Sequence, residues 1–497
     1  MATRSSARPS RREFLIGAGA GLVAAAATAP GCEPARRPAA APDLRPNILF
    51  LLTDDQRWDT LGCMGNPLIR TPHVDRLASL GTVFENMFVT TSICMASRAS
   101  FFTGQYTRCH GVDDFSKPLS PEAFALSYPE RLRAAGYRTG FVGKYGVGPV
   151  PEGRFDFIRA FAGQGHYFPE SPAARARPQD AGELAGPHQN ALMADQAIEF
   201  LDDGSPGRPF CLSVSFKSPH CQDGDPRQFL SEPDLADLYK DAAIPAPATA
   251  DPADFDRLPD FVKRSEGRRR WPVRFATPEM RQEMVRAYWR LISGVDRAVG
   301  RLCDALDARG LASNTVILFA GDNGFFLGEH GLAGKWLAYE ESIRVPLVVY
   351  DPRLAFAQRG RRVREPALNI DVAPTILDLA GLPVPDAMQG RSLVALARGE
   401  APPWRTDWFY EHTMLPGIIP PSEAVRDARY KYIRYVAADP PVEELYDLAA
   451  DPHEARSLAA DPSHADRLAA LRLRWQTWHD ALAAWRPDRA GRLRELL

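Results

Sequence analysis

The chain contains 497 residues, of which 45% are hydrophobic and 25% are charged, and its formal net charge is −2. This composition is that of an ordinary globular protein, and the length predicts either one large α/β unit or a large unit with a smaller one attached. The small net charge argues against nucleic acid as the main partner.

The first 32 residues have the pattern of an export signal. A twin-arginine motif, SRREFL at residues 10–15, precedes an apolar run at residues 16–29 that is too short and too rich in Gly and Ala for a membrane span. The pattern predicts export of the folded protein by the twin-arginine route, to the periplasm or the outside of the cell. The sequence APGC at residues 29–32 weakly resembles a lipoprotein cleavage site, so a lipid anchor at Cys32 stays an open alternative.

Beyond a Pro/Ala-rich linker at residues 33–46, continuous apolar runs predict strands that are buried on both faces of a parallel sheet. They cover residues 47–53, 140–143, 210–216, 315–320 and 346–350. Apolar residues at helical spacing predict helices over residues 74–80, 191–201 and 278–306. The alternation predicts an α/β sheet with helices on both faces, in which ligands gather beyond the carboxyl ends of the strands.

The segment CMASRASFFTG at residues 94–104 places a thiol at the expected start of a helix. Unpaired backbone N–H groups and the macrodipole favour an anion at that position. Arg98 follows Cys94 by one helical turn, so the two side chains share a face, and the guanidinium suits an oxyanion. A buried core cysteine is the alternative for a thiol considered alone, whereas the combination indicates a site that handles anions.

Polar residues follow four of the predicted strands. Asp54 and Asp55 come after the first, Lys144 after the second, His220 after the third, and Asp322 with Asn323 after the fourth. We expect these side chains to meet at one edge of the sheet. The carboxylate and amide oxygens are hard ligands without a matching Cys or His pair, which favours Ca²⁺ or Mg²⁺ over zinc.

A Pro/Asp-rich insertion begins near residue 245 and contains the basic stretch KRSEGRRRWPVR at residues 263–274. Such runs are typical of solvated loops, and that is the interpretation we favour. The alternative is that the stretch forms one wall of a groove for a polyanionic glycan.

From Trp404 onward the pattern changes to short strand-like segments at residues 407–412, 424–427 and 430–435, followed by helical periodicity at residues 467–485. This predicts a smaller α+β domain. The expected organisation is a signal segment at 1–32, a linker at 33–46, a catalytic domain at 47–400 and a C-terminal subdomain at 401–497.

Of the seven cysteines, Cys211 and Cys221 have a spacing that allows a short disulfide loop, and free thiols are the equal alternative.

The segment at residues 94–104 resembles the signature of the type I sulfatases, which belong to the alkaline phosphatase-like superfamily. Cys94, Ser97, Arg98, Thr103 and Gly104 match that signature. The resemblance implies that a maturation enzyme converts Cys94 to formylglycine. Ala96 stands where the family usually has proline, and such variants are associated with radical-type maturases in this family.

The resemblance covers nearly the whole mature chain. Residues 328–335 and 339–346 match a second long motif, and residues 444–448 with 451–454 resemble the closing segment of sulfatases. The implied fold is a large, mostly parallel sheet sandwiched by helices, with a smaller C-terminal α+β domain that contains an antiparallel sheet.

The resemblance also implies roles for the residues at the strand ends. Four residues would bind one calcium ion, with magnesium as the second choice: Asp54, Asp55, Asp322 and Asn323. Arg98 and Lys144 would hold the hydrated aldehyde, one hydroxyl of which attacks sulfur. Lys335 and His220 would bind the sulfate, and one of them would protonate the departing alcohol oxygen.

One position departs from the family pattern. Gly146 stands where a histidine is usual, and that histidine normally contacts the formylglycine hydroxyl and helps to expel sulfate. His166 is a candidate substitute or substrate contact, with an ordinary loop histidine as the alternative. His330 lies in a family motif, and we expect it to have a substrate-binding or structural role.

These features predict an exported, calcium-dependent sulfuric ester hydrolase that acts on a sulfated small molecule or glycan, with a sulfated sugar as the first choice. Hydrolysis of phosphonate or phosphate esters on the same fold is the second hypothesis. The third is an inactive binder of sulfated glycans in which Cys94 is not matured. The full set of carboxylates and cations argues against this last hypothesis, because binding alone does not require it.

Overall fold

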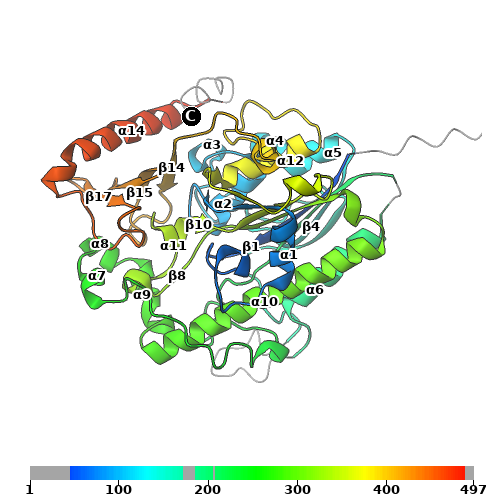
Figure 1. Ribbon diagram of the computed structural model, residues 1–497, viewed down its shortest axis with the longest axis horizontal. Coiled ribbons are helices and arrows are strands. Elements are labelled where there is room, and N and C mark those ends of the chain that lie inside the picture. The colour runs from blue at the N-terminus through cyan, green and yellow to red at the C-terminus, as the bar shows by residue number, and fades with distance from the viewer. Residues whose placement is uncertain (1–44, 172–184, 205–206, 487–497) are drawn as a thin grey trace, which may run out of the picture. The chain divides into compact units, whose positions relative to one another are not determined.

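The centre of the fold is an eight-stranded sheet with the order β12-β2-β11-β7-β1-β6-β4-β5 (Figure 1). Its strands are β1 (Asn47–Thr53), β2 (Thr82–Phe84), β4 (Arg138–Lys144), β5 (Phe157–Phe161), β6 (Phe210–Ser215), β7 (Thr315–Gly321), β11 (Leu347–Tyr350) and β12 (Arg361–Val363). The four neighbours β7, β1, β6 and β4 run parallel, so their carboxyl ends meet at one edge. Only β11 runs antiparallel to its neighbours among the strands described for this sheet. The mostly parallel sheet predicted from the sequence is confirmed.

The structure is a computed structural model that describes residues 45–171, 185–204 and 207–486. The predicted export signal, Cys32 and nearly all of the linker lie outside the described residues. Among the helices that are described, none combines the length and the apolar character needed to cross a membrane.

Side chains of β1 alternate between two apolar cores, one on each face of the sheet. Ile48, Phe50 and Leu52 belong to one core, and Leu49 and Leu51 belong to the other. Because successive side chains of a strand point to opposite faces, a strand covered on both sides is apolar at every position. This explains the continuous apolar run in the sequence.

Helices cover both faces of the sheet (Figure 1). One face carries α1 (Pro72–Leu80), α6 (Gln189–Asp202) and α10 (Pro278–Ala308), and the opposite face carries α2 (Cys94–Thr103), α4 (Pro121–Leu126), α5 (Tyr128–Ala134) and α12 (Val372–Leu379). Thr277 caps α10 by accepting a hydrogen bond from the backbone of Met280, and Pro278 occupies the first turn, where a missing N–H does no harm. The helices predicted over 74–80, 191–201 and 278–306 are confirmed.

Shorter elements complete this part of the chain. They are the helices α3 (Thr107–His110), α11 (Glu340–Ile343) and α13 (Val394–Arg398), the small sheet of β10 (Arg344–Val345), β3 (Met87–Phe88) and β13 (Ala367–Leu368), and the pair β8 (Phe326–Leu327) and β9 (Ala333–Gly334).

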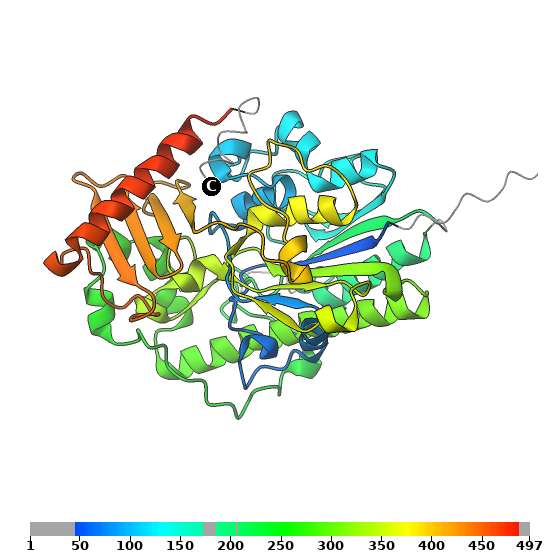
Figure 2. The ribbon, with the colours of Figure 1, turned by 45° about the horizontal axis from the view of Figure 1, so that its top comes forward.

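A second sheet follows in the C-terminal part of the chain. It is antiparallel and consists of β14 (Asp407–His412), β15 (Ser422–Asp427), β16 (Tyr430–Tyr435) and β17 (Val442–Asp447). The helix α14 (Ala465–Ala483) lies across it (Figure 2). Trp408 of β14 stacks on Phe88 of β3 with ring centroids 4.8 Å apart, and both belong to the apolar core that covers one face of the eight-stranded sheet. The antiparallel C-terminal sheet is as predicted, while the domain boundary after residue 400 stays a prediction.

The insertion forms three helices, α7 (Pro252–Asp256), α8 (Asp260–Lys263) and α9 (Glu266–Arg274), so the prediction of a solvated loop over residues 263–274 is wrong. Glu266 lies in the first turn of α9 and pairs with Arg270 at 2.7 Å, which is the helical i,i+4 spacing. Arg268 and Arg274 are held against the protein: the first donates to the carbonyl of Gly331, and the second is 2% exposed. The ion pair and these contacts stabilise α9 more than Pro272, which lies inside the helix, destabilises it.

The described cysteines are all free thiols, including Cys211 and Cys221. Of the two alternatives for this pair, the structure has the one without a disulfide.

Candidate active site

The carboxyl ends of β7, β1, β6 and β4 bring together the polar residues singled out in the sequence. Asp54 and Asp55 follow β1, Asp322 and Asn323 follow β7, Lys144 ends β4, and His220 lies in the loop after β6. Backbone hydrogen bonds tie these ends to one another: the N–H of Asp54 donates to Ser218 at 3.1 Å, and that of Asp322 donates to Thr53 at 2.9 Å. The strand order therefore assembles four segments that are far apart in the chain.

Arg98 connects all four strand ends. Its Nε donates to Asp322 Oδ2 at 2.8 Å, and one terminal nitrogen donates to the carbonyl of Lys144 at 2.8 Å and to Ser215 Oγ. The other terminal nitrogen lies 3.2 Å from Asp54 Oδ2. The side chain is 1% exposed. The guanidinium fork thus fixes the two carboxylates and both flanking strands in one arrangement.

Asp54 is fully buried between two cations. Its Oδ2 accepts a hydrogen bond from Lys144 Nζ, whereas its Oδ1 has no hydrogen-bond partner in the described structure. Burial alone would raise the pKa of Asp54, but the positive charges of Lys144 and Arg98 outweigh it and lower the pKa. The carboxylate is therefore ionised and has one oxygen available for a cation.

Asp55 adopts a left-handed backbone conformation, with φ of 62°, which is rare for a residue with a side chain. Three groups hold it there: its N–H donates to Asp322 Oδ1 at 3.0 Å, and its Oδ1 accepts from Asn323 Nδ2 at 2.6 Å and from Lys335 Nζ. The Tyr288 hydroxyl donates to the Asp55 carbonyl. The strained turn aims the Asp55 carboxylate into the cluster.

The donor set fits a hard divalent cation. Asn323 Oδ1 is buried and, like Asp54 Oδ1, has no hydrogen-bond partner in the part of the chain that the structure describes. Burial and the neighbouring charge of Asp54 raise the pKa of Asp322 to about 7. Asp54, Asp55 and His220 also place one ligand atom each within 4.8 Å of one another. Hard oxygen donors with unmet bonding capacity are what calcium or magnesium requires.

Cys94 is the first residue of α2 and is 3% exposed. Ile93 precedes it as the N-cap and offers no side-chain acceptor, so the helix start lacks the usual capping oxygen. Burial by itself lowers the pKa of both Arg98 and Lys335. A negative charge on Cys94 would act in the opposite direction and raise the pKa of both, so the Cys94 side chain lies within electrostatic reach of the two cations. The thiol occupies a position suited to an anionic group.

His220 presents a defined nitrogen to the cluster. Its Nδ1 lies 2.7 Å from the carbonyl of Cys221, and since a carbonyl only accepts, Nδ1 carries the proton. Nε2 then faces Asp55 Oδ2 at 3.5 Å. Burial lowers the pKa of His220 well below its usual value. Lys335 is buried as well, but the negative charge of Asp55 outweighs the effect of burial and raises the pKa of Lys335. The imidazole is neutral and Lys335 retains its positive charge.

Two further residues at the site were missed in the sequence. Gln164 Oε1 accepts a hydrogen bond from Lys144 Nζ at 2.6 Å, and Gly163 and Gly165 on either side of it both have positive φ. The Gly-Gln-Gly pattern signals the tight turn that presents this amide. Lys217 is fully buried, with Nζ 4.9 Å from the centre of the Tyr167 ring and 3.4 Å from the carbonyl of Cys221. Lys217 lies three residues before His220 in the sequence, and this short separation could have indicated that the lysine belongs to the site.

The two other histidines singled out in the sequence, His166 and His330, have different surroundings. His166 Nδ1 accepts a hydrogen bond from Gln222 at 3.1 Å. His330 is 1% exposed and stacks on Tyr339 with ring centroids 4.8 Å apart, and burial lowers its pKa to about 4. These contacts give His330 a packing role, which is one of the two roles expected for it.

Two protein-family models match this chain. The model described as Sulfatase matches residues 46–382, and the model described as N-sulphoglucosamine sulphohydrolase, C-terminal, matches residues 328–480. Together the two matches span most of the described residues.

Individual relatives agree with the family models. The N-acetylglucosamine-6-O-sulfatase of Bacteroides thetaiotaomicron is 29% identical over 477 residues, which cover 83% of this chain and 82% of that protein. A solved structure in complex with its substrate D-glucosamine-2-N,6-O-disulfate has a TM-score of 0.74 and 25% identity, and the match covers 90% of this chain and 99% of the other. The phosphonate monoester hydrolase of Agrobacterium radiobacter has a TM-score of 0.72 and 26% identity, with 88% and 96% covered.

Proposed function

Because the chain belongs to the sulfatase family, we propose that it releases inorganic sulfate from a sulfated carbohydrate, using a formylglycine made from Cys94 and a bound calcium ion. The observation that carries this proposal is the pair of unpartnered oxygens on Asp54 and Asn323 beside the buried cations Arg98 and Lys144. The unpartnered oxygens suit a metal ion, and the buried cations suit one anionic group.

The proposed substrate class is supported by the relatives. One is an N-acetylglucosamine-6-O-sulfatase, and one solved structure holds a sulfated glucosamine. We therefore propose a sulfated amino sugar or a closely related sulfated saccharide for this chain. A formylglycine-generating maturation enzyme is the implied partner, and export by the twin-arginine route is the proposed path of the folded enzyme out of the cytoplasm.

Asp54, Asp55, Asp322 and Asn323 would hold calcium, or magnesium as the second choice. The ion would supply positive charge that neutralises the sulfate oxygens and stabilises the ionised nucleophile. In this arrangement Asp55 and Asp322 are already oriented by the hydrogen bond that the Asp55 N–H donates to the Asp322 carboxylate, and by Lys335 and Arg98. Orientation of the ligands before the ion binds reduces the reorganisation that binding requires.

Arg98 and Lys144 would act mainly by position and charge. The guanidinium is committed to Asp54, Asp322 and the flanking strands, so it fixes the cluster while its charge stabilises the anion formed at position 94. Lys144 Nζ is held by Asp54 and Gln164, which points the ammonium into the same space. A hydrated formylglycine at this position supplies the hydroxyl nucleophile.

His220 and Lys335 are the proposed proton carriers. Lys335 holds its proton at Nζ beside Asp55 and would bind a sulfate oxygen or protonate the departing alcohol oxygen. His220 has its proton on Nδ1 and leaves Nε2 open toward the cluster, so it can accept a proton at that atom and return it to the alcohol oxygen. The overall reaction adds one water and yields the free alcohol and sulfate.

A direct assay tests this proposal. Protein produced in a host that matures formylglycine should release sulfate from a 6-O-sulfated N-acetylglucosamine, and the Cys94→Ala variant should release none. If matured protein released sulfate neither from this sugar nor from an aryl sulfate, the proposed function would be wrong.

The second candidate function is hydrolysis of phosphonate monoesters, which the similarity to the Agrobacterium radiobacter enzyme favours. Paired aryl sulfate and aryl phosphonate substrates with the same leaving group distinguish the two. We expect the larger kcat/KM for the sulfate, and a clear preference for the phosphonate would replace the first proposal with the second.

A further inference from the structure

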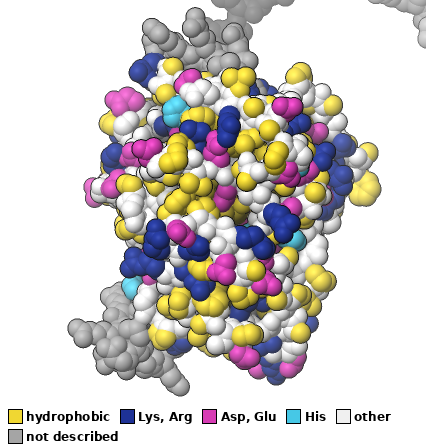
Figure 3. All heavy atoms as spheres, turned by 90° about the vertical axis from the view of Figure 1, so that its left-hand side faces the viewer, with side chains coloured by type: hydrophobic (Ala, Val, Ile, Leu, Met, Phe, Trp, Pro, Cys, Tyr) yellow, Lys and Arg dark blue, Asp and Glu magenta, His cyan; other side chains and the backbone are white. Residues whose placement is uncertain are grey.

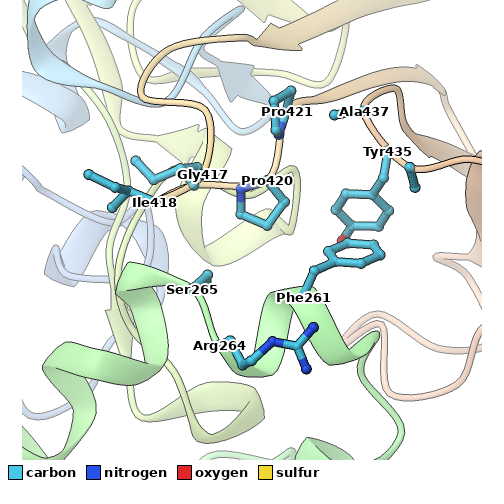
Figure 4. Close-up of a pocket in the computed structure, with 11 residues that line it drawn as sticks. Phe261, Arg264, Ser265, Gly417, Ile418, Pro420, Pro421, Tyr435 and Ala437 are labelled. Carbon is cyan, nitrogen blue, oxygen red and sulfur yellow. The ribbon is translucent and has the colours of Figure 1, made fainter.

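A cavity of about 270 Å³ lies where the insertion meets the C-terminal sheet. We call it the α9 pocket and define it by Phe261, Arg264, Ser265, Ile418, Pro421 and Tyr435. Figure 4 shows the rings of Phe261 and Tyr435 close together on one side, with Ser265 and Arg264 on the helical side of the space. The ring centroids are 4.8 Å apart. The pocket is an apolar hollow with a small polar edge, which is the usual composition of a site for a small ligand.

Ser265 supplies an unsatisfied polar group to the pocket. It is 4% exposed, and its hydroxyl has no hydrogen-bond partner within the described residues. It is also the N-cap of α9, yet its side chain does not cap the helix. A buried hydroxyl without a partner is costly in free energy, and at a helix N-terminus it lies in a positive field. Ser265 thus lines the pocket with a buried hydroxyl that has no acceptor among the described residues.

Arg264 places a solvent-exposed guanidinium at the edge of the pocket. Its guanidinium forms neither an ion pair nor a side-chain hydrogen bond with any residue in the described ranges, whereas Arg270 and Arg274 of the same segment both contact Asp223. An arginine fork free of protein partners matches the geometry of a sulfate or a carboxylate.

The helix α9 links the pocket to the candidate active site. It begins at Glu266, whose N–H donates to Ile418 at 3.1 Å, and it ends at Arg274, which contacts Cys221 Sγ at 2.9 Å, next to His220. Nine helical residues rise about 13 Å. The pocket and the proposed proton carrier are therefore attached to opposite ends of one short, rigid element.

We propose that the α9 pocket binds a second, anionic sugar residue of the substrate, one or more units away from the sulfate that is removed. Arg264 and the Ser265 hydroxyl would bind its sulfate or carboxylate, and the ring would pack on Tyr435 and Pro421. The cavity of about 270 Å³ is of a size that suits a single sugar residue. On the face that carries α7 to α9 and the C-terminal sheet, hydrophobic side chains gather near the middle with basic groups on both sides (Figure 3).

This inference rests on the proposed function, and its test separates the two. The variants Arg264→Gln and Ser265→Ala would be compared with Arg364→Gln, which removes the same charge from an 86% exposed side chain paired with Glu85. Four substrates would be used: an aryl sulfate, two sulfated oligosaccharides whose second residue carries either a sulfate or a carboxylate, and the same oligosaccharide with a neutral second residue.

For Arg264→Gln we expect kcat/KM to fall about tenfold on the anionic oligosaccharides and to stay within about twofold on the other two substrates. Separate sulfate and carboxylate substrates show which anion the pocket prefers. Wild-type kinetics of both variants on every oligosaccharide would overturn the proposal, as would an equal loss on the aryl sulfate.

If the wild type hydrolysed no sulfate ester, the proposed function would fail, and calorimetric titration of the anionic oligosaccharide into the full chain would still test the pocket. Unchanged affinity in Arg264→Gln would then overturn it.

Discussion

A Cβ atom placed on Gly146 would lie 2.7 Å from Cδ of Arg98, and the backbone of Gly146 has φ of +72°. The arginine that connects the four strand ends therefore occupies the space that a side chain at this position would need. Both the close approach and the left-handed conformation require glycine. The absence of the histidine usual in the family is thus coupled to the position of Arg98.

We predict that Gly146→His lowers kcat/KM at least tenfold and destabilises the fold by about 1–3 kcal/mol, because Arg98 must move and the backbone is strained. The matched control is Gly153→His, since Gly153 has φ of +66° and a Cβ atom placed on it would meet open space. Kinetics on an aryl sulfate and thermal unfolding measure both effects. Higher activity in Gly146→His would show that Arg98 does not need its present position.

Removal of divalent cations should lower the Tm, and added calcium should restore it. Binding to the native state alone stabilises by about 2.7 kcal/mol at a hundred times the Kd. Asn323→Ala removes one of the unpartnered oxygens and should abolish the calcium-dependent shift in Tm. Asp237→Asn, at an 89% exposed carboxylate, is the control and should keep the shift. A wild-type shift in Asn323→Ala would place the ion elsewhere.

Lys217 should oppose folding while it supports anion binding. Burial, followed by repulsion from Lys144, lowers its pKa to about 8, so the charged form is disfavoured in the native state. In the unfolded chain the lysine keeps its proton up to about pH 10.5, so stability rises with pH between about 8 and 10.5, and the penalty is complete below pH 8. Lys217→Met should therefore raise stability by about 1–3 kcal/mol at pH 7, with less gain at pH 10.

The same variant should also weaken competitive inhibition by inorganic sulfate, because the site loses one positive charge. Lys240→Met, at a 60% exposed lysine, provides the control for both measurements. If Lys217→Met were destabilising at pH 7 and left sulfate inhibition unchanged, the buried ammonium would have a structural role only.

Glu444 on β17 should make the protein less stable as the pH rises. Burial raises its pKa to about 7, although the hydroxyl of Tyr339 donates to it at 3.0 Å. The unfolded chain loses this proton near pH 4.5 and the folded chain near pH 7, so stability falls across that window. Glu444→Gln should therefore be more stable than the wild type at pH 8, by about 1–3 kcal/mol, and equal to it near pH 4.5.

The neighbouring Glu443 is a control of opposite sign. Despite partial burial, hydrogen bonds from Arg472 and Tyr432 lower the pKa of Glu443, so its ionised form stabilises the fold. Glu443→Gln should lose stability at pH 8. Thermal unfolding of the three proteins between pH 4.5 and 8 provides the comparison, and parallel curves for the wild type and Glu444→Gln would contradict the assignment.

The sequence alone predicted the strands and the residues that follow them, because a strand buried on both faces is apolar at every position and ends abruptly at polar groups such as Asp54 and Asp55. It did not predict the strand order, which depends on contacts between distant segments. Gln164 was missed because its role arises only when its loop meets Lys144. The helix α9 was missed because its arginines find partners, such as Asp223 and the Gly331 carbonyl, that lie far away in the chain.

The central claim is that the nucleophile at position 94 is an aldehyde derived from Cys94. Mass spectrometry of the tryptic peptide that contains residue 94, from active enzyme made in its own host, tests it most directly. We predict that the peptide carries the mass of formylglycine. The fraction of peptide with this mass should match the fraction of enzyme molecules that active-site titration finds to be active. An unmodified thiol throughout a fully active preparation would contradict the claim.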